Sequence, residues 1–155
     1  MSTGTEYQYR GARASVILHK QALASFVATW RGAQKRSLAL PVTQAPDYAS
    51  LEHLLYHVVA CARGYMVWMC ESLNLPDPKI RTAPPREKLA AELDDYLVHL
   101  FEAWQQPLRD VDEQRFNECS DSSWGVSYCI DGMLEHAVMH PIRHEFQLKE
   151  LMPVE

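Results

Sequence analysis

Hydrophobic residues recur at spacings of three, four and seven along most of the chain, which is the pattern of amphipathic helices. Four segments carry this pattern, and each predicts one helix: residues 13–37, about 47–73, 86–106 and about 122–152. No segment shows the alternation of hydrophobic and polar residues that is typical of a half-buried strand. The pattern therefore predicts an all-α protein, most simply a four-helix bundle, in a single domain spanning residues 1–155.

Local signals set the expected ends of these helices. Residues 1–12 contain few hydrophobic side chains and are predicted to form a loose lead-in. The polar segment 108–123 is predicted to be a long connection that crosses to the last helix, with a short strand or a turn of helix within it. Serine and aspartate side chains favour helix N-caps because they accept a free N–H of the first turn. The expected caps are Asp47 or Ser50 for the second helix and Ser122 or Ser123 for the fourth.

Composition and charge exclude several classes of partner. The 155 residues carry a net charge of −5 and the isoelectric point is about 5.8, so no basic surface for nucleic acid or anionic lipid is expected. No apolar run approaches the ~20 residues that a membrane-spanning helix needs. The N-terminal residues lack the apolar stretch of a signal peptide. These features predict a cytoplasmic protein that binds neither nucleic acid nor membrane.

The four cysteines do not form a recognisable metal or disulfide motif. They show no C-x-x-C spacing, and a cytoplasmic setting disfavours disulfides. Cys61 lies one helical turn after His57 and so could face the same site. The favoured interpretation of Cys61 is a small buried apolar side chain.

Histidines form the most informative pattern in the chain. Five of the seven fall into two groups with spacing four: His53 and His57 in the second predicted helix, and His136, His140 and His144 in the fourth. Residues four apart lie on one helix face, and two imidazoles so placed can reach one metal ion. The working hypothesis is a metal held between these helices by His57, His140 and His144. His53 and His136 remain alternative ligands.

Five other residues near these patterns carry expectations of their own. His19 has no histidine partner at spacing four and is expected at the polar edge of its helix, and His99 is expected on the surface. Glu145 is expected to point to solvent. Arg143 is expected on the surface, with an inward anion clamp as the alternative. Pro141 removes one helical hydrogen bond and is expected to kink the helix or to restart it.

Two well-known metal motifs are excluded by the spacing. An H-E-x-x-H protease motif needs a histidine that the run from His144 to Leu148 lacks. A ferritin-like di-iron site needs two Glu-x-x-His pairs, but Glu52 and Glu135 are followed at the third position by Leu55 and Val138.

The run H-x-x-x-H-x-x-x-H-x-x-Q-L over residues 136–148, together with L-L-Y-H ending at His57, resembles the DinB-like superfamily, which includes YfiT-like proteins. The resemblance implies a four-helix bundle with a long crossover before the last helix. It implies a divalent ion, zinc or nickel, bound by His57, His140 and His144. It also implies a metal-dependent enzyme, a thiol-dependent transferase or isomerase that uses a low-molecular-weight thiol and a small-molecule substrate, and a homodimer. The sequence departs from the H-R-G-Q that often follows the last ligand, since Glu145 and Phe146 stand there.

Two other functions stay open at this stage. One is a non-catalytic metal-binding or stress-response bundle that acts as a sensor or as a dimeric interaction protein. The other is an empty histidine cluster without metal, whose mutually repelling imidazolium ions would lower stability below about pH 6.

Overall fold

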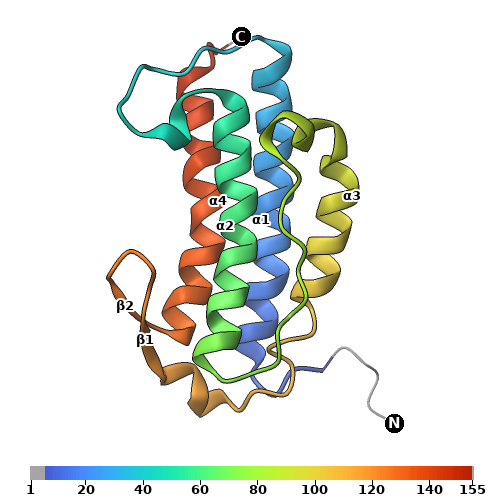
Figure 1. The fold of residues 1–155 in the computed structure, drawn as a ribbon, viewed down its shortest axis with the longest axis vertical. Coiled ribbons are helices and arrows are strands. Elements are labelled where there is room, and N and C mark those ends of the chain that lie inside the picture. Colours follow the sequence, from blue (N-terminus) through green and yellow to red (C-terminus); the bar gives the residue numbers. More distant parts are fainter. Residues whose placement is uncertain (1–5, 155) are drawn as a thin grey trace.

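The computed structural model describes residues 6–154, and within them the protein is mainly helical (Figure 1). Four α-helices lie side by side along the long axis of the molecule. They are α1 (Arg10–Lys35), α2 (Leu51–Ser72), α3 (Arg86–Trp104) and α4 (Ile130–Leu151). The connections hold two short 3-10 helices, η1 (Pro46–Tyr48) and η2 (Glu113–Asn117), and two strands, β1 (Cys119–Asp121) and β2 (Ser127–Cys129). The prediction of a mainly helical chain is confirmed, and no helix within residues 6–154 is long and apolar enough to cross a membrane.

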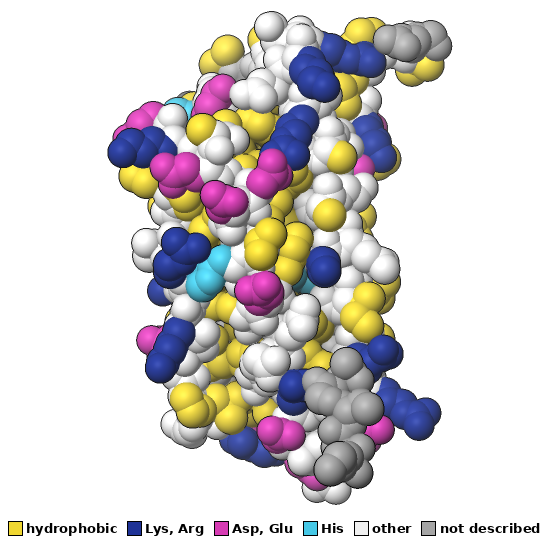
Figure 2. Space-filling model, turned by 90° about the vertical axis from the view of Figure 1, so that its right-hand side faces the viewer, with side chains coloured by type: hydrophobic (Ala, Val, Ile, Leu, Met, Phe, Trp, Pro, Cys, Tyr) yellow, Lys and Arg dark blue, Asp and Glu magenta, His cyan; other side chains and the backbone are white. Residues whose placement is uncertain are grey.

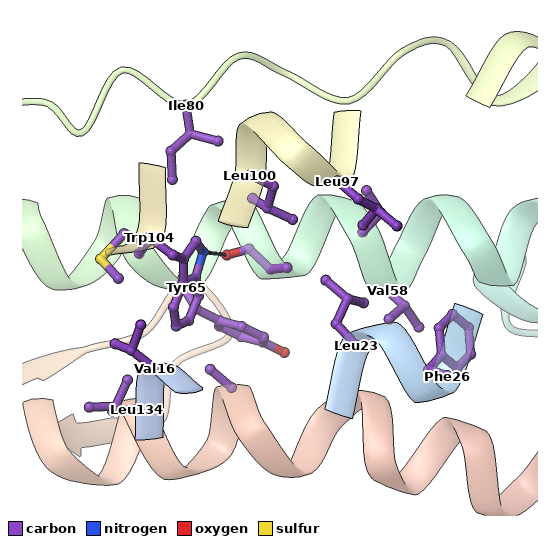
Figure 3. Packing of buried hydrophobic residues seen from close by; sticks show 14 of the residues in the cluster. Val16, Leu23, Phe26, Val58, Tyr65, Ile80, Leu97, Leu100, Trp104 and Leu134 are labelled. Carbon is purple, nitrogen blue, oxygen red and sulfur yellow. Dashed lines mark hydrogen bonds between the residues drawn. The ribbon is translucent and has the colours of Figure 1, made fainter. Parts of the chain in front are cut away.

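The hydrophobic faces of the four helices meet in one interior. Helix α1 contacts α4 and α2, and α2 also contacts α3 and α4. Figure 3 shows Leu23 from α1, Val58 from α2 and Leu134 from α4 pointing into this interior. Trp30 and Trp104 are both 1% exposed, and each indole N–H donates to a carbonyl of α2. Because these indoles reach α2 from α1 and α3, they help to fix the position of the helix that carries His57.

The N-terminal segment is more ordered than predicted. Helix α1 begins at Arg10, so the predicted lead-in of residues 1–12 is too long; residues 1–5 lie outside the described part of the chain. The Tyr7 hydroxyl donates to the carbonyl of Gln105 at 2.6 Å, and the Gln8 N–H donates to the carbonyl of Arg109 at 2.9 Å. These long-range hydrogen bonds, which the local composition does not reveal, attach the segment to the end of α3.

Helix α2 begins as its capping signal predicts. Ser50 is the N-cap, and its hydroxyl accepts the backbone N–H of His53 at 3.2 Å. The same hydroxyl lies 2.8 Å from Nδ1 of the His53 ring. His53 therefore takes part in the start of the helix, one turn away from His57.

Helix α4 begins later than predicted, because a β-hairpin occupies the residues before it. Strands β1 and β2 pair antiparallel, with Cys119 opposite Cys129. Ser122, predicted as a helix cap, instead closes the hairpin: its N–H donates to the carbonyl of Val126 and its hydroxyl accepts the N–H of Val126. Gly125 in this turn has a φ of +82°, a conformation that glycine adopts readily. The cap of α4 is Cys129, whose sulfur accepts the N–H of Gly132.

Pro141 lies inside α4, and the helix runs through it from Ile130 to Leu151. Of the two expected effects of Pro141, a kink or a restart of the helix, the restart does not occur. Buried residues both before and after the proline, Ala137 and Leu148 among them, pack into the same interior and hold the two halves of the helix together.

Candidate metal centre

Three histidines from two helices converge near the middle of α2 and α4. His57 comes from α2, and His140 and His144 lie one turn apart on α4, which packs against α2. Each offers a ring nitrogen, and these atoms lie within 4.8 Å of one another. The Nε2 atoms of His57 and His140 are 3.1 Å apart. The structure thus brings together the three residues that the spacing predicted, close enough to bind one metal ion.

The distance between the His57 and His140 nitrogens fits a tetrahedral ion. Two nitrogens bound to zinc at 2.0–2.1 Å in tetrahedral geometry are ~3.3 Å apart, close to the 3.1 Å between His57 and His140. Imidazole nitrogens are ligands that zinc and nickel both accept. The donor set and this one distance therefore suit a divalent transition metal.

Two polar side chains contact the ring nitrogens of His57 and His144 that face away from the cluster. Asp47 Oδ2 lies 3.3 Å from Nδ1 of His57, and Gln147 Oε1 lies 3.0 Å from Nδ1 of His144. Because carboxylate and amide oxygens accept hydrogen bonds, these contacts favour a proton on each Nδ1 and leave each Nε2 with a free lone pair. Such outer hydrogen bonds are the usual support of metal-binding histidines.

Burial keeps the three imidazoles neutral at neutral pH. Burial, together with the nearby His144 and His57, lowers the pKa of His140 to about 2. Burial and the neighbouring His57 likewise bring the pKa of His144 to about 4. Burial also lowers the pKa of His57, although the charge of Asp47 opposes this. Neutral imidazole is the form that binds a metal, so the cluster is prepared for an ion.

A cavity of about 360 Å³ lies beside His57. Cys61 lines it and is only partly buried, contrary to the favoured interpretation, with its sulfur 3.7 Å from Nδ1 of His57. Burial raises the pKa of the Cys61 thiol, so the thiol is protonated at neutral pH. Tyr65 and Trp124 form aromatic walls of the same cavity. A space of this size and character suits a small organic molecule.

His136 lies one turn before His140 and outside the cluster of three. Its ring is surrounded by aromatic side chains, with centroids 5.3–5.6 Å from those of Tyr65, Trp124 and Tyr128. Tyr48, from η1, touches the cluster itself and lies 5.7 Å from the ring of His144. His136 is therefore a neighbour of the cluster within an aromatic surround.

Glu145 does not point to solvent, and that expectation is wrong. The residue is 9% exposed, and its carboxylate accepts hydrogen bonds from Ser25 and Thr29 of α1, both at 2.8 Å. Lys149 approaches the same oxygen at 3.0 Å. Burial alone would raise the pKa of Glu145, but these hydrogen bonds outweigh it and lower the pKa. The carboxylate thus joins α4 to α1 next to His144 instead of facing the ion site.

Replacing Glu145 by alanine is expected to destabilise the fold by about 2–3 kcal/mol, the usual range for hydrogen bonds to a charged group. The loss arises because α4 would lose the two hydrogen bonds that the Ser25 and Thr29 hydroxyls of α1 donate to the Glu145 carboxylate. Urea unfolding at pH 7 measures it. Glu150→Ala, at an exposed position of the same helix, is the control, and an equal loss in both variants would contradict the assignment.

Three further expectations have mixed outcomes. Arg143 is exposed, as expected, although its charge contributes, after burial, to the lowered pKa of His136. His99 is partly buried and accepts the backbone N–H of Arg81 at 3.0 Å. His19 is 1% exposed and not at the polar edge of its helix, because α1 is covered on that side by α3, where the ring stacks on Trp104.

Compared with known proteins, the chain matches no protein-family model, no curated protein and no solved structure. Sequence reasoning missed the orienting roles of Asp47 and Gln147. A signal for Gln147 was present, since it lies three residues after His144 on the same helix face. Asp47 was considered only as a helix cap, and its contact with His57 depends on the path of η1.

Proposed function

We propose that this protein is a divalent-metal-dependent enzyme acting on a small molecule, with His57, His140 and His144 as the ligands of zinc or nickel. One observation carries the proposal: two helices bring three neutral imidazoles within 4.8 Å of one another. Three protein ligands leave a coordination position open for water or substrate, which is typical of catalytic rather than structural zinc sites.

The class of reaction is proposed from the resemblance to the DinB-like superfamily. It is a transferase or isomerase reaction that depends on a low-molecular-weight thiol, in a cytoplasmic homodimer of the DinB-like bundle type. When bound, the ion would supply Lewis acidity that favours the deprotonated form of a thiol or water. The chain's own contribution would be to hold the imidazoles of His57 and His144 through Asp47 and Gln147, and to seat the organic substrate against Tyr65 and Trp124.

Metal content is the direct test. The protein would be purified without a nickel column and analysed by mass spectrometry for metals. Close to one zinc or nickel per chain is expected, removable by a strong chelator and restored by adding the ion. Thiol-transfer and isomerisation assays with several low-molecular-weight thiols would follow on the loaded and the chelated protein. If the purified protein contains no metal and takes up none from added zinc or nickel, the proposal fails.

Replacing Asp47 by alanine is expected to weaken metal binding by about 10–100-fold without abolishing it, the usual effect of losing an outer hydrogen bond to a ligand. The reason is that the His57 ring loses the carboxylate that orients it and favours a proton on Nδ1. Competition against a chromophoric chelator measures the affinity. The control is Glu52→Ala, which removes an exposed carboxylate at the start of α2, and matching affinities in the two variants would refute the orienting role.

A second candidate is a non-catalytic metal-binding bundle, a sensor or interaction protein. It is favoured by the contacts of the two carboxylates described around the cluster, because both already bind other side chains. Asp47 contacts His57, and Glu145 is held by Ser25 and Thr29, so neither is free to serve as a general base. Stoichiometric metal together with no activity across the thiol panel would favour this candidate.

A further inference from the structure

A second cavity, of about 450 Å³, lies between α1 and α3 and shares no lining residue with the histidine cluster or the cavity beside it. Val16, Ile17 and Ala24 of α1 and Phe101 of α3 supply its apolar walls. The segment before α1 closes one side through Tyr7, whose hydroxyl is bonded to the carbonyl of Gln105. The volume is within the range of small-molecule sites.

His19 and Trp104 form the floor of this α1–α3 cavity. The two rings stack nearly parallel, 8° apart, with centroids separated by 3.7 Å. Trp104 is fixed by its hydrogen bond to the carbonyl of Ala62. His19 is 1% exposed, and within residues 6–154 neither of its ring nitrogens has a hydrogen-bond partner. Buried polar atoms in native proteins are nearly always hydrogen-bonded, so an imidazole with two free nitrogens at the floor of a cavity needs an explanation.

The charged residues that line the described cavity are all cations: Arg13, Lys20 and Arg109. Burial raises the pKa of Tyr7, while the charges of Arg109 and Arg13 oppose this rise, which places both guanidinium groups near its hydroxyl. The ammonium group of Lys20 lies 5.6 Å from the centre of the Phe101 ring. This local positive charge contrasts with the net charge of −5 of the whole chain. Figure 2 shows the face that carries α3, where hydrophobic side chains lie exposed among charged side chains of both signs.

We propose that the α1–α3 cavity binds a small aromatic carboxylate. The flat apolar part of the ligand would lie between Phe101 and the aliphatic side chains of α1, above the His19–Trp104 floor. Its carboxylate would face the cations, since guanidinium groups bind carboxylates in a two-pronged geometry. Once the exposed Lys20 or Gln21 side chain moves aside, the second carboxylate oxygen would reach the edge of the floor and accept the N–H of the His19 ring, which has no partner among the described residues. The site does not depend on the metal centre or on the proposed enzyme activity.

Binding of 1-naphthaleneacetate and of its uncharged amide tests the proposal by calorimetry on the whole chain. The acid is expected to bind at least about tenfold more tightly than the amide, because only the acid forms charge-assisted hydrogen bonds. A double variant, Arg13→Gln with Lys20→Gln, is expected to lose about tenfold in affinity for the acid and to bind the amide unchanged. Lys88→Gln, an exposed lysine of α3 outside the cavity lining, is the matched control and should bind like the parent.

Nitrogen NMR of histidine-labelled protein locates the ligand. The His19 ring signals are expected to shift on addition of the acid, in the chelated and the metal-loaded protein alike. His19→Phe keeps a flat ring over Trp104 and is expected to bind the acid more weakly; its circular dichroism spectrum verifies that it remains folded. The proposal is overturned if acid and amide bind equally, if neither binds at millimolar concentration, if the double variant binds the acid like the parent, or if the shifts occur at the cluster histidines instead of His19.

Discussion

The His140→Ala protein is expected to contain no stoichiometric metal. Its affinity for zinc is expected to fall more than about a hundredfold below that of the parent, because losing even an outer hydrogen bond to a ligand weakens metal binding 10–100-fold. The His140 ring contacts both other ligands: its centroid is 4.9 Å from that of His57 and 4.7 Å from that of His144. His140 is only 6% exposed, so water has little access to take its place. Metal analysis and chelator competition measure the loss.

Two histidines with the same helical spacing provide matched controls. His136→Ala removes the imidazole one turn before His140, and His53→Ala removes the one before His57; neither residue belongs to the group of three. Both variants are expected to retain metal near the parental level. Retention of metal by His140→Ala, or its loss in a control variant with an intact fold, would show that the ligand set is different.

The metal-free protein is expected to unfold on acidification between about pH 6 and pH 4. The pKa values of His19, His140 and His144 are lowered to about 3, 2 and 4 from an ordinary value of 6.5. Below pH 6.5 the unfolded chain therefore binds protons that the native state does not. Three such protons reduce the free energy of unfolding by about 4 kcal/mol per pH unit, against a typical stability of 5–15 kcal/mol.

Circular dichroism at a series of pH values, with and without zinc, measures this acid transition. Zinc is expected to move the midpoint to lower pH, because the ion competes with protons for His140 and His144 but not for His19. His19→Phe is expected to reduce the slope by about one proton, roughly a third. A transition that zinc leaves unchanged would favour the empty histidine cluster, and stability that is constant down to pH 4 would contradict the burial of neutral imidazoles.

Features encoded within one helix were predictable from the sequence. The hydrophobic spacing located all four helices, and the Ser50 cap fixed the start of α2. The i,i+4 spacing placed His140 and His144 on one face of α4, and the second histidine group supplied His57 from the facing helix. Local periodicity and capping are enough for these features because each depends on neighbours within a few residues.

Features that depend on contacts between distant segments were not predictable in this way. Glu145 has the spacing of a solvent-facing residue on α4, and its burial depends on Ser25 and Thr29 of α1. His19 was expected at the polar edge of α1, and its burial depends on Trp104 of α3, which stacks on the ring. Ser122 is a favourable helix N-cap by residue type, but its hydroxyl accepts a hydrogen bond in the hairpin turn. The pairing of β1 with β2 prevents α4 from starting earlier.

The 83 residues that separate His57 from His140 have a consequence for how the protein acquires its stability. An ion bound to both would act as a cross-link across that length of chain and disfavour the unfolded state by about 4.5 kcal/mol in the chain-entropy treatment used for disulfides. The site also cannot be completed until α4 has been synthesised and has docked on α2. Metal uptake would therefore be a late event in folding, and the lifetime of the folded chain would depend on the supply of the ion.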